Sequence, residues 1–339
     1  SLIMAAPAPP GGDPPKQSSS KGTKLYYMPS KPVAEQSDKQ KVWFNFIQSI
    51  YRADMEAFEG LLPQIDDINK NQVASNGWPP VMHAVHKNRF EFVQKLIERG
   101  ANLNVIDHKN GRSLLHNAVE HGYLEMMQLL MRYNLDINTV DNEGESPLWT
   151  AARKSYVDMV ELLLENNPSN QQICNINLRK SANGQTALFV SADRGYLEVV
   201  KLLLAYQAMR VNVDEPDLHG RTPLIRACIK SHEEIVKLLL QHGANINAVN
   251  EWQRYPLMIA FRLNKPKICK LLLNNDCGEG IQLWRPDRNG KYILDFKTHQ
   301  SDKRIAKQIE TVLHTVLQSA LQEFNKDLPE TIVRVICYL

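Results

Sequence analysis

The stretch GRTPLIRACIKSHEEIVKLLLQHGANIN, residues 220–247, contains the pattern on which the fold depends. It holds two short apolar segments, PLIRAC and EEIVKLLL, separated by polar residues. Thr222 followed by Pro223 is typical of a helix start, because the hydroxyl caps free backbone amides and proline fits the first turn. Gly243 falls where a helix ends and the chain needs a positive φ. The stretch therefore predicts two short helices joined by a turn.

Related stretches recur along the chain at intervals of 33 to 40 residues. Each unit opens at a glycine, except one that opens at Gln253, and the glycines are Gly77, Gly111, Gly144, Gly184, Gly220 and Gly290. Helices of about eight residues cannot each fill a core alone, so neighbouring units must stack and share their apolar faces. The repeat predicts one elongated all-α array, a solenoid.

The repeat resembles the ankyrin repeat from about Trp43 to Phe296, carried by GRTPLIRAC, EEIVKLLLQHGANIN and GYLEVVKLLL. The resemblance implies about seven helix-turn-helix units with short hairpin fingers. Two departures stand out: only His116 holds the family's histidine position, and other residues replace the glycine in the middle of four units. Those four residues are Asn88, Ser155, Ser231 and Asn264.

Composition divides the chain into three parts. Residues 1–41 are rich in Pro, Ser and Lys and are expected to form a flexible tail. Residues 42–296 form the array, with degenerate first and last units. Residues 297–339 are expected to form C-terminal amphipathic helices, which either cap the last repeat or dock a partner. Their apolar stripe begins with Ile305 and Ile309.

The sequence offers no catalytic, cofactor-binding or metal-binding pattern, so we expect a protein that is not an enzyme and needs no cofactor or metal. Its histidines are scattered through the units and are expected to cap helices or lie on the surface. The five cysteines contain no CxxC pair and are expected to be buried in a reducing compartment. No apolar run approaches the roughly 18 residues of a membrane helix. The predicted location is the cytoplasm, the nucleus or both.

The candidate binding site is a concave groove, which the resemblance implies is lined by the hairpin tips and the first helix of each unit. Thirteen basic side chains occupy the groove-facing positions, against five acidic ones, so the groove has a net charge of +8 on a background of −5. Trp78 and Trp252 lie among them as apolar anchors. A groove of one sign attracts an oppositely charged ligand, which predicts an acidic or phosphorylated protein segment as partner. The basic residues are Lys87, Lys109, Arg112, Arg153, Lys154, Arg194, Arg221, Arg226, Lys230, Arg254, Arg262, Arg288 and Lys291.

We interpret the protein as an interaction scaffold or adaptor, with three alternatives left open. Residues 315–339 resemble parts of an F-box, in LPETIVRVICYL, and of a suppressor-of-cytokine-signalling box, which implies a substrate receptor of a cullin-type ubiquitin ligase. A basic groove with aromatic residues also suits single-stranded nucleic acid, although the near-neutral total of 40 basic against 37 acidic residues argues against that class. The array could also target a larger enzyme or a bacterial or viral effector.

Overall fold

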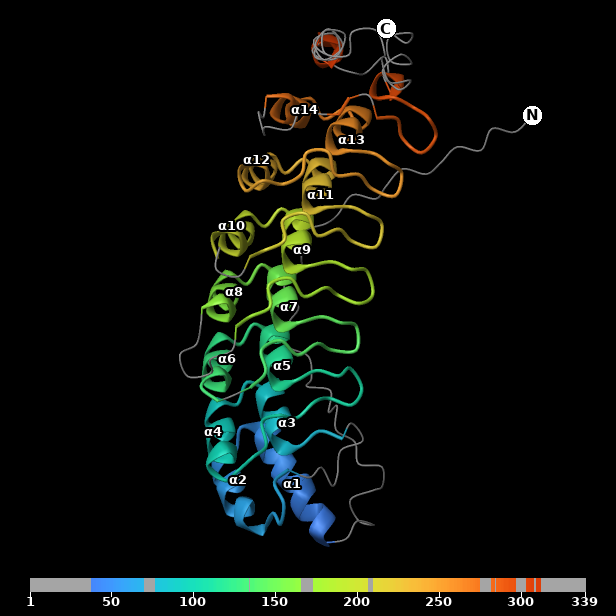
Figure 1. The fold of residues 1–339 in the computed structure, drawn as a ribbon. Coiled ribbons are helices and arrows are strands. Elements are labelled where there is room, and N and C mark those ends of the chain that lie inside the picture. The colour runs from blue at the N-terminus through green and yellow to red at the C-terminus, as the bar shows by residue number, and fades with distance from the viewer. Residues whose placement is uncertain are drawn as a thin grey trace, which may run out of the picture.

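The fold is a column of paired helices, seen in a computed structural model (Figure 1). The structure describes residues 38–69, 77–133, 135–165, 173–206, 210–274, 282–283, 285–296, 303–307 and 309–311. The inner layer contains the first helix of each unit: α1 (Asp38–Arg52), α3 (Pro80–His86), α5 (Leu114–His121), α7 (Pro147–Lys154), α9 (Ala187–Arg194), α11 (Pro223–Lys230) and α13 (Pro256–Arg262). The outer layer contains the second: α2 (Met55–Leu61), α4 (Phe90–Glu98), α6 (Leu124–Met131), α8 (Val157–Leu164), α10 (Leu197–Ala205), α12 (Glu233–Gln241) and α14 (Pro266–Leu273).

The inner helices begin where the sequence predicts. The hydroxyl oxygens of Ser113, Ser146, Thr186 and Thr222 each accept a hydrogen bond from the backbone amide three residues later. Where the cap residue is Tyr255, no side-chain bond forms, and Pro256 at the first helical position supplies the start signal instead. Hydroxyl caps and prolines thus set the first residue of the inner helices from α3 to α13.

The turns between paired helices require a left-handed backbone. Gly122 and Gly195 end α5 and α9 with φ values of 74° and 80°. Ser155 and Ser231 end α7 and α11 in the same conformation, with φ values of 59° and 64°. The residues that replace glycine therefore keep the turn, at the cost of placing a Cβ where glycine is favoured.

The core is continuous along the column. Each inner helix contacts the next inner helix, as α9 contacts α7 and α11, and the outer helices from α6 to α14 stack likewise. Leu224, Ala227, Val236 and Leu239 of one unit are fully buried. No unit encloses its apolar face alone, so the stacking stabilises the array through neighbour contacts.

The hairpin fingers project from the inner layer on the side away from the outer layer (Figure 1). An aspartate recurs at the base of most fingers, and in the finger before α7 the carboxylate of Asp141 accepts hydrogen bonds from the amides of Glu143 and Glu145. Asp217 and Asp287 do the same in later fingers. Each carboxylate holds its own finger closed.

The two predicted terminal segments are described only in part. Residues 303–307 and 309–311 are helical, and Ile305 and Ile309 are buried, as in the predicted stripe. The rest of 297–339, including the ligase-like segment, and residues 1–37 of the predicted tail lie outside the described residues. Whether the C-terminal helices cap the array or dock a partner stays a prediction. Within the described ranges, no helix is both long enough and apolar enough to span a bilayer.

Candidate functional site

The candidate site is the inner face, which we define as the surface formed by the last turns of α3, α5, α7, α9, α11 and α13 together with the fingers. Side chains of these inner helices reach the neighbouring unit. The Nζ of Lys154 lies 2.8 Å from a carboxylate oxygen of Glu120, and the Nε of Arg226 donates to Asp193 at 2.8 Å. The inner face is therefore a single surface shared by successive units.

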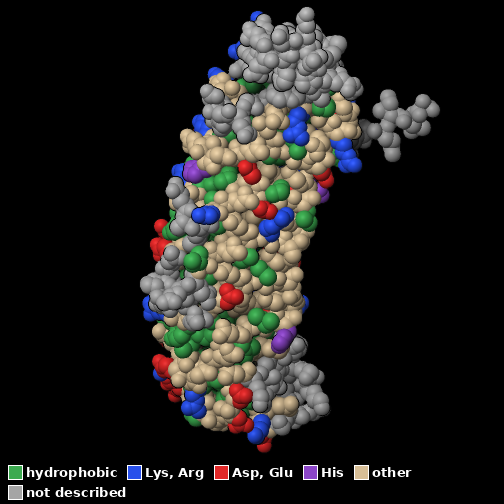
Figure 2. Space-filling model, viewed as in Figure 1, with side chains coloured by type: hydrophobic (Ala, Val, Ile, Leu, Met, Phe, Trp, Pro, Cys, Tyr) green, Lys and Arg blue, Asp and Glu red, His purple; other side chains and the backbone are tan. Residues whose placement is uncertain are grey.

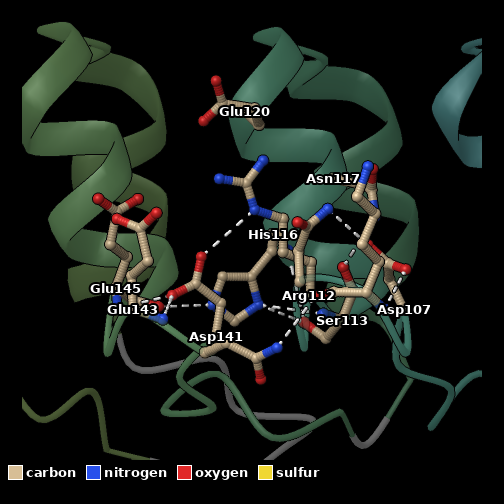
Figure 3. Close-up of polar contacts among 12 residues, drawn as sticks. Asp107, Arg112, Ser113, His116, Asn117, Glu120, Asp141, Glu143 and Glu145 are labelled. Atoms are coloured by element: carbon tan, nitrogen blue, oxygen red, sulfur yellow. Dashed lines mark hydrogen bonds and ion pairs between the residues drawn. The ribbon is translucent and has the colours of Figure 1, made fainter. Parts of the chain in front are cut away.

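Six of the thirteen predicted cations form ion pairs within the protein. Arg112 lies 3.3 Å from the buried carboxylate of Asp141, which comes from the next finger (Figure 3). Arg254 donates twice to the buried Asp287, at 3.0 and 2.7 Å. Arg221 pairs with the buried Asp217 of its own finger. The remaining paired cations are Arg153, Lys154 and Arg226, whose carboxylate partners are Glu120 and Asp193.

Three of these partners are buried aspartates that the sequence count of the groove did not include. Asp141, Asp217 and Asp287 each lie three residues before the opening glycine, a position that the count left out. Their recurrence at that position is the sequence signal that could have identified them. Including them lowers the net positive charge of the inner face.

The other seven predicted cations make no ion pair with any residue that the structure describes. Lys87 is half-buried and lies over the ring of Tyr51, with its Nζ 4.9 Å from the ring centroid. The remaining six are exposed: Lys109, Arg194, Lys230, Arg262, Arg288 and Lys291. Five of the six lie in α9 or beyond, so the available positive charge gathers in the C-terminal half. In the view of Figure 2, Lys and Arg side chains are scattered among uncharged ones and do not form one continuous patch.

The two predicted tryptophan anchors have different surroundings. The Trp78 indole donates to Asp107 at 3.0 Å, and its ring lies 5.5 Å from His83 and 5.1 Å from His86. These contacts make it part of the packing of the N-terminal units. Trp252 is 44% exposed on a finger, and the guanidinium of Arg254 lies 5.6 Å from its ring. Of the two, Trp252 is the one with surface available to a partner.

One more aromatic ring belongs to the basic half. The ring of Phe296, in the short 3₁₀ helix η4 (Ile293–Phe296), has three cationic groups between 5.5 and 6.0 Å from its centroid. They belong to Arg254, Arg262 and Lys291. Cations within about 6 Å of an aromatic face are attracted by its quadrupole. The ring therefore helps to position Arg262 and Lys291, which carry no carboxylate partner in the described ranges.

The histidines of the N-terminal units are more buried than the sequence predicts. His116 caps α5 through Ser113, as expected, and its other ring nitrogen lies 2.9 Å from the carbonyl oxygen of Glu145 in the next unit (Figure 3). For His83 the prediction of a capping or surface residue is wrong, because its side chain is fully buried and contacts the hydroxyl of Tyr51 at 3.0 Å. Burial, with the nearby His86, lowers the pKa of His83 to about 3.

The described cysteines are buried inside the units. Burial raises the pKa of Cys174 and of Cys269 to about 12, and it raises the pKa of Cys228 as well. A thiol that stays protonated is a poor nucleophile and metal ligand. Among the residues that the structure describes, no three His, Cys, Asp or Glu side chains are placed to hold a metal ion.

A family model described as "Ankyrin repeats (3 copies)" matches residues 46–141, 102–173, 127–217, 169–250 and 208–287, and these matches together span residues 46–287. The chain belongs to the ankyrin-repeat family. The expected ankyrin solenoid is thereby confirmed, and ankyrin repeats are protein–protein interaction modules. The ankyrin repeat domain of Bcl-3 has the same fold, with a TM-score of 0.58 and 21% identity, over 67% of this chain and 97% of that one.

Three curated relatives are similar over most of this chain. Ankyrin repeat protein L371 of Acanthamoeba polyphaga mimivirus is 28% identical over 75% of this chain and 32% of the relative. The E3 ubiquitin-protein ligase KEG of Arabidopsis thaliana is 27% identical over 68% and 16%. The human transient receptor potential cation channel subfamily A member 1 is 28% identical over 79% and 24%. The chain thus spans about a third or less of the length of these relatives.

Proposed function

We propose that this protein is a non-enzymatic scaffold or adaptor whose inner face binds an acidic or phosphorylated segment of a partner protein. The observation that carries the proposal is a row of exposed cations, Arg194, Lys230 and Arg262, one on each of three successive inner helices. None of the three has an ion-pair partner among the described residues. A surface of one charge sign raises the local concentration of an oppositely charged segment and speeds its capture.

The C-terminal half supports this proposal better than the N-terminal half does. In α7 the corresponding position is Lys154, and Glu120 already neutralises it. In α5 the corresponding residue is His121. Binding an anion at Lys154 requires breaking its ion pair with Glu120, whereas Arg194, Lys230 and Arg262 make no ion pair with any described residue.

The proposal is tested with a fluorescein-labelled peptide rich in glutamate, measured by fluorescence anisotropy against the full chain. In the triple variant R194Q/K230Q/R262Q we expect binding about tenfold weaker, because three exposed ion pairs contribute about 0.5 kcal/mol each. The matched control is K201Q/K237Q/K270Q, which removes three charges from α10, α12 and α14 in the outer layer. Equal weakening in both variants would show that only overall charge matters and would contradict a site on the inner face.

The nucleic-acid alternative is tested in the same assay with a labelled single-stranded oligonucleotide. A phosphate-backbone binder holds unrelated sequences alike and weakens steeply as salt is added. Tighter binding of the oligonucleotide than of the peptide, with that salt dependence, would favour nucleic acid over protein. The ligase-receptor alternative depends on residues 315–339, outside the described part, and stays a prediction.

A further inference from the structure

The spacing of the exposed cations carries information about the bound segment beyond its charge. We define the cationic row as Arg194, Lys230 and Arg262, the last residues of α9, α11 and α13; Arg194 and Lys230 directly precede the left-handed residue of the turn, whereas Arg262 lies one residue earlier in its unit. These three helices stack directly on one another. Packed helices lie about 8–10 Å apart, so the row presents one positive charge at about each such step.

An extended peptide advances about 3.3 Å per residue. Every second residue then falls about 6.6 Å along the chain, every third about 10 Å and every fourth about 13 Å. Only the third-residue spacing matches the separation of stacked helices. From this match we propose that the bound segment is extended and carries carboxylate side chains, Asp or Glu, at positions i, i+3 and i+6. The inference rests on the proposed function, since it assumes that the inner face binds an acidic segment.

The chemistry of the row favours carboxylates. Among the described residues, each of the three helices contributes one cation that makes no ion pair, and at α13 Lys291 of the following finger lies near the same Phe296 ring as Arg262. At the first two steps, Arg194 and Lys230, a single charge matches a monoanion better than a doubly charged phosphate. The outer positions are arginines, whose planar guanidinium can bind both oxygens of one carboxylate.

The row has a defined beginning. The cation before it, Lys154 at the end of α7, is bound to Glu120 through both its side-chain carboxylate and its backbone carbonyl. The three acidic positions therefore fall on the units of α9, α11 and α13 and do not continue toward α1. A helical segment would need about fifteen residues to present three charges at this spacing, whereas an extended one needs seven.

The test compares peptides of identical composition and net charge that differ only in the order of residues. Four labelled peptides place three glutamates at every second, third or fourth position or contiguously, and a fifth, helix-forming peptide places them at every seventh. Anisotropy with the full chain is expected to show the third-residue peptide binding about tenfold tighter than the others. That preference disappears in R194Q/K230Q/R262Q and persists in K201Q/K237Q/K270Q.

A double-mutant cycle tests the register directly. Lys230→Gln is combined with Glu→Gln at the middle acidic position of the third-residue peptide. If the two groups pair, both changes together weaken binding no more than either change alone. If the two losses in affinity multiply, Lys230 does not pair with the middle glutamate and the proposed register is wrong.

The remaining outcomes separate this inference from the proposed function. Equal binding of all five peptides, with equal weakening in the row variant, would overturn the third-residue spacing and leave the acidic-segment function standing. Tightest binding by the helical peptide would overturn the extended conformation. Absence of binding by any peptide would contradict the proposed function itself.

Discussion

At the scale of single residues, seven non-glycine residues of the described chain adopt positive φ, and four of them replace glycine in the middle of a unit. Ser231, which ends α11 with φ 64°, has in addition a buried hydroxyl with no hydrogen-bond partner in the described structure. A left-handed Cβ and an unsatisfied hydroxyl both cost free energy. The chain keeps this residue although its local geometry favours glycine.

We expect Ser231→Gly to raise the free energy of unfolding by about 1 kcal/mol, because the relief of both costs exceeds the added entropy of glycine in the unfolded chain. Urea denaturation followed by circular dichroism measures the change as a higher midpoint. Ser231→Ala is the control, since it removes the hydroxyl and keeps the Cβ, and it should gain less. A lower midpoint for the glycine variant would contradict the strain argument.

At the scale of elements, the fingers depend on carboxylates that serve two purposes at once. In the last finger, one oxygen of Asp287 accepts from the amides of Asn289 and Lys291, and the other accepts from Arg254 of the preceding finger. Burial alone would raise the pKa of Asp287, but these hydrogen bonds outweigh it and lower the pKa. One side chain therefore closes a finger and joins it to its neighbour.

We expect Asp287→Asn to lower the free energy of unfolding by about 3 kcal/mol, because the nearly buried guanidinium of Arg254 loses its counter-charge. The asparagine oxygen can still accept from the two finger amides, which isolates the effect of charge. Glu120→Gln is the comparison: its pair with Arg153 and Lys154 is about one quarter exposed, and its loss should cost under about 1 kcal/mol. Urea midpoints of the two variants check this, and equal losses would contradict the role of burial.

At the scale of the whole molecule, the two halves of the inner face differ in chemistry. The N-terminal half holds rings in edge-to-face contact, with the ring centroid of His86 4.8 Å from that of His121 and 5.1 Å from that of Trp78. The C-terminal half holds the cationic row and the exposed Trp252. We therefore expect a partner to bind the C-terminal half and acid to destabilise the N-terminal half.

We expect acid to destabilise the protein between pH 6.5 and 5. Burial lowers the pKa of His83 to about 3 and also lowers the pKa of His86 and of His116, all from an ordinary 6.5. The unfolded chain then binds protons that the folded chain does not, so stability is full above pH 6.5 and falls as the pH drops. The slope is up to about 1.4 kcal/mol per pH unit for each histidine.

Urea midpoints at pH 7.5, 6 and 5 measure this loss. His83→Gln should be less stable at pH 7.5 and lose less between pH 7.5 and 5, whereas His242→Gln, at an exposed position, should keep the original dependence. A midpoint that stays constant over this range in the unmodified protein would refute the assignment of buried neutral histidines.

The local signals of the fold could be predicted from the sequence, and the pairings across units could not. Thr222–Pro223 and Gly195 mark helix ends through forces that act within a few residues. Whether the charge of Arg226 is neutralised depends on Asp193, 33 residues away. The hydrogen bond of the Trp78 indole likewise depends on Asp107, 29 residues away. The positions of charged residues within the repeat indicate where cations gather. They cannot tell which are neutralised, because that depends on how closely successive units stack.

Successive fingertips are joined by single backbone hydrogen bonds, such as Leu218 to Asn183, Glu251 to His219 and Arg288 to Trp252. Because a continuous core joins the stacked helices, whereas neighbouring fingertips share one backbone hydrogen bond, we expect the fingertips to move more readily than the helices. We expect small movements of the fingertips to accommodate a bound strand whose rise differs by a fraction of an ångström per residue. We also expect pulling on the two ends to unfold the units one after another, because each unit contacts only its neighbours.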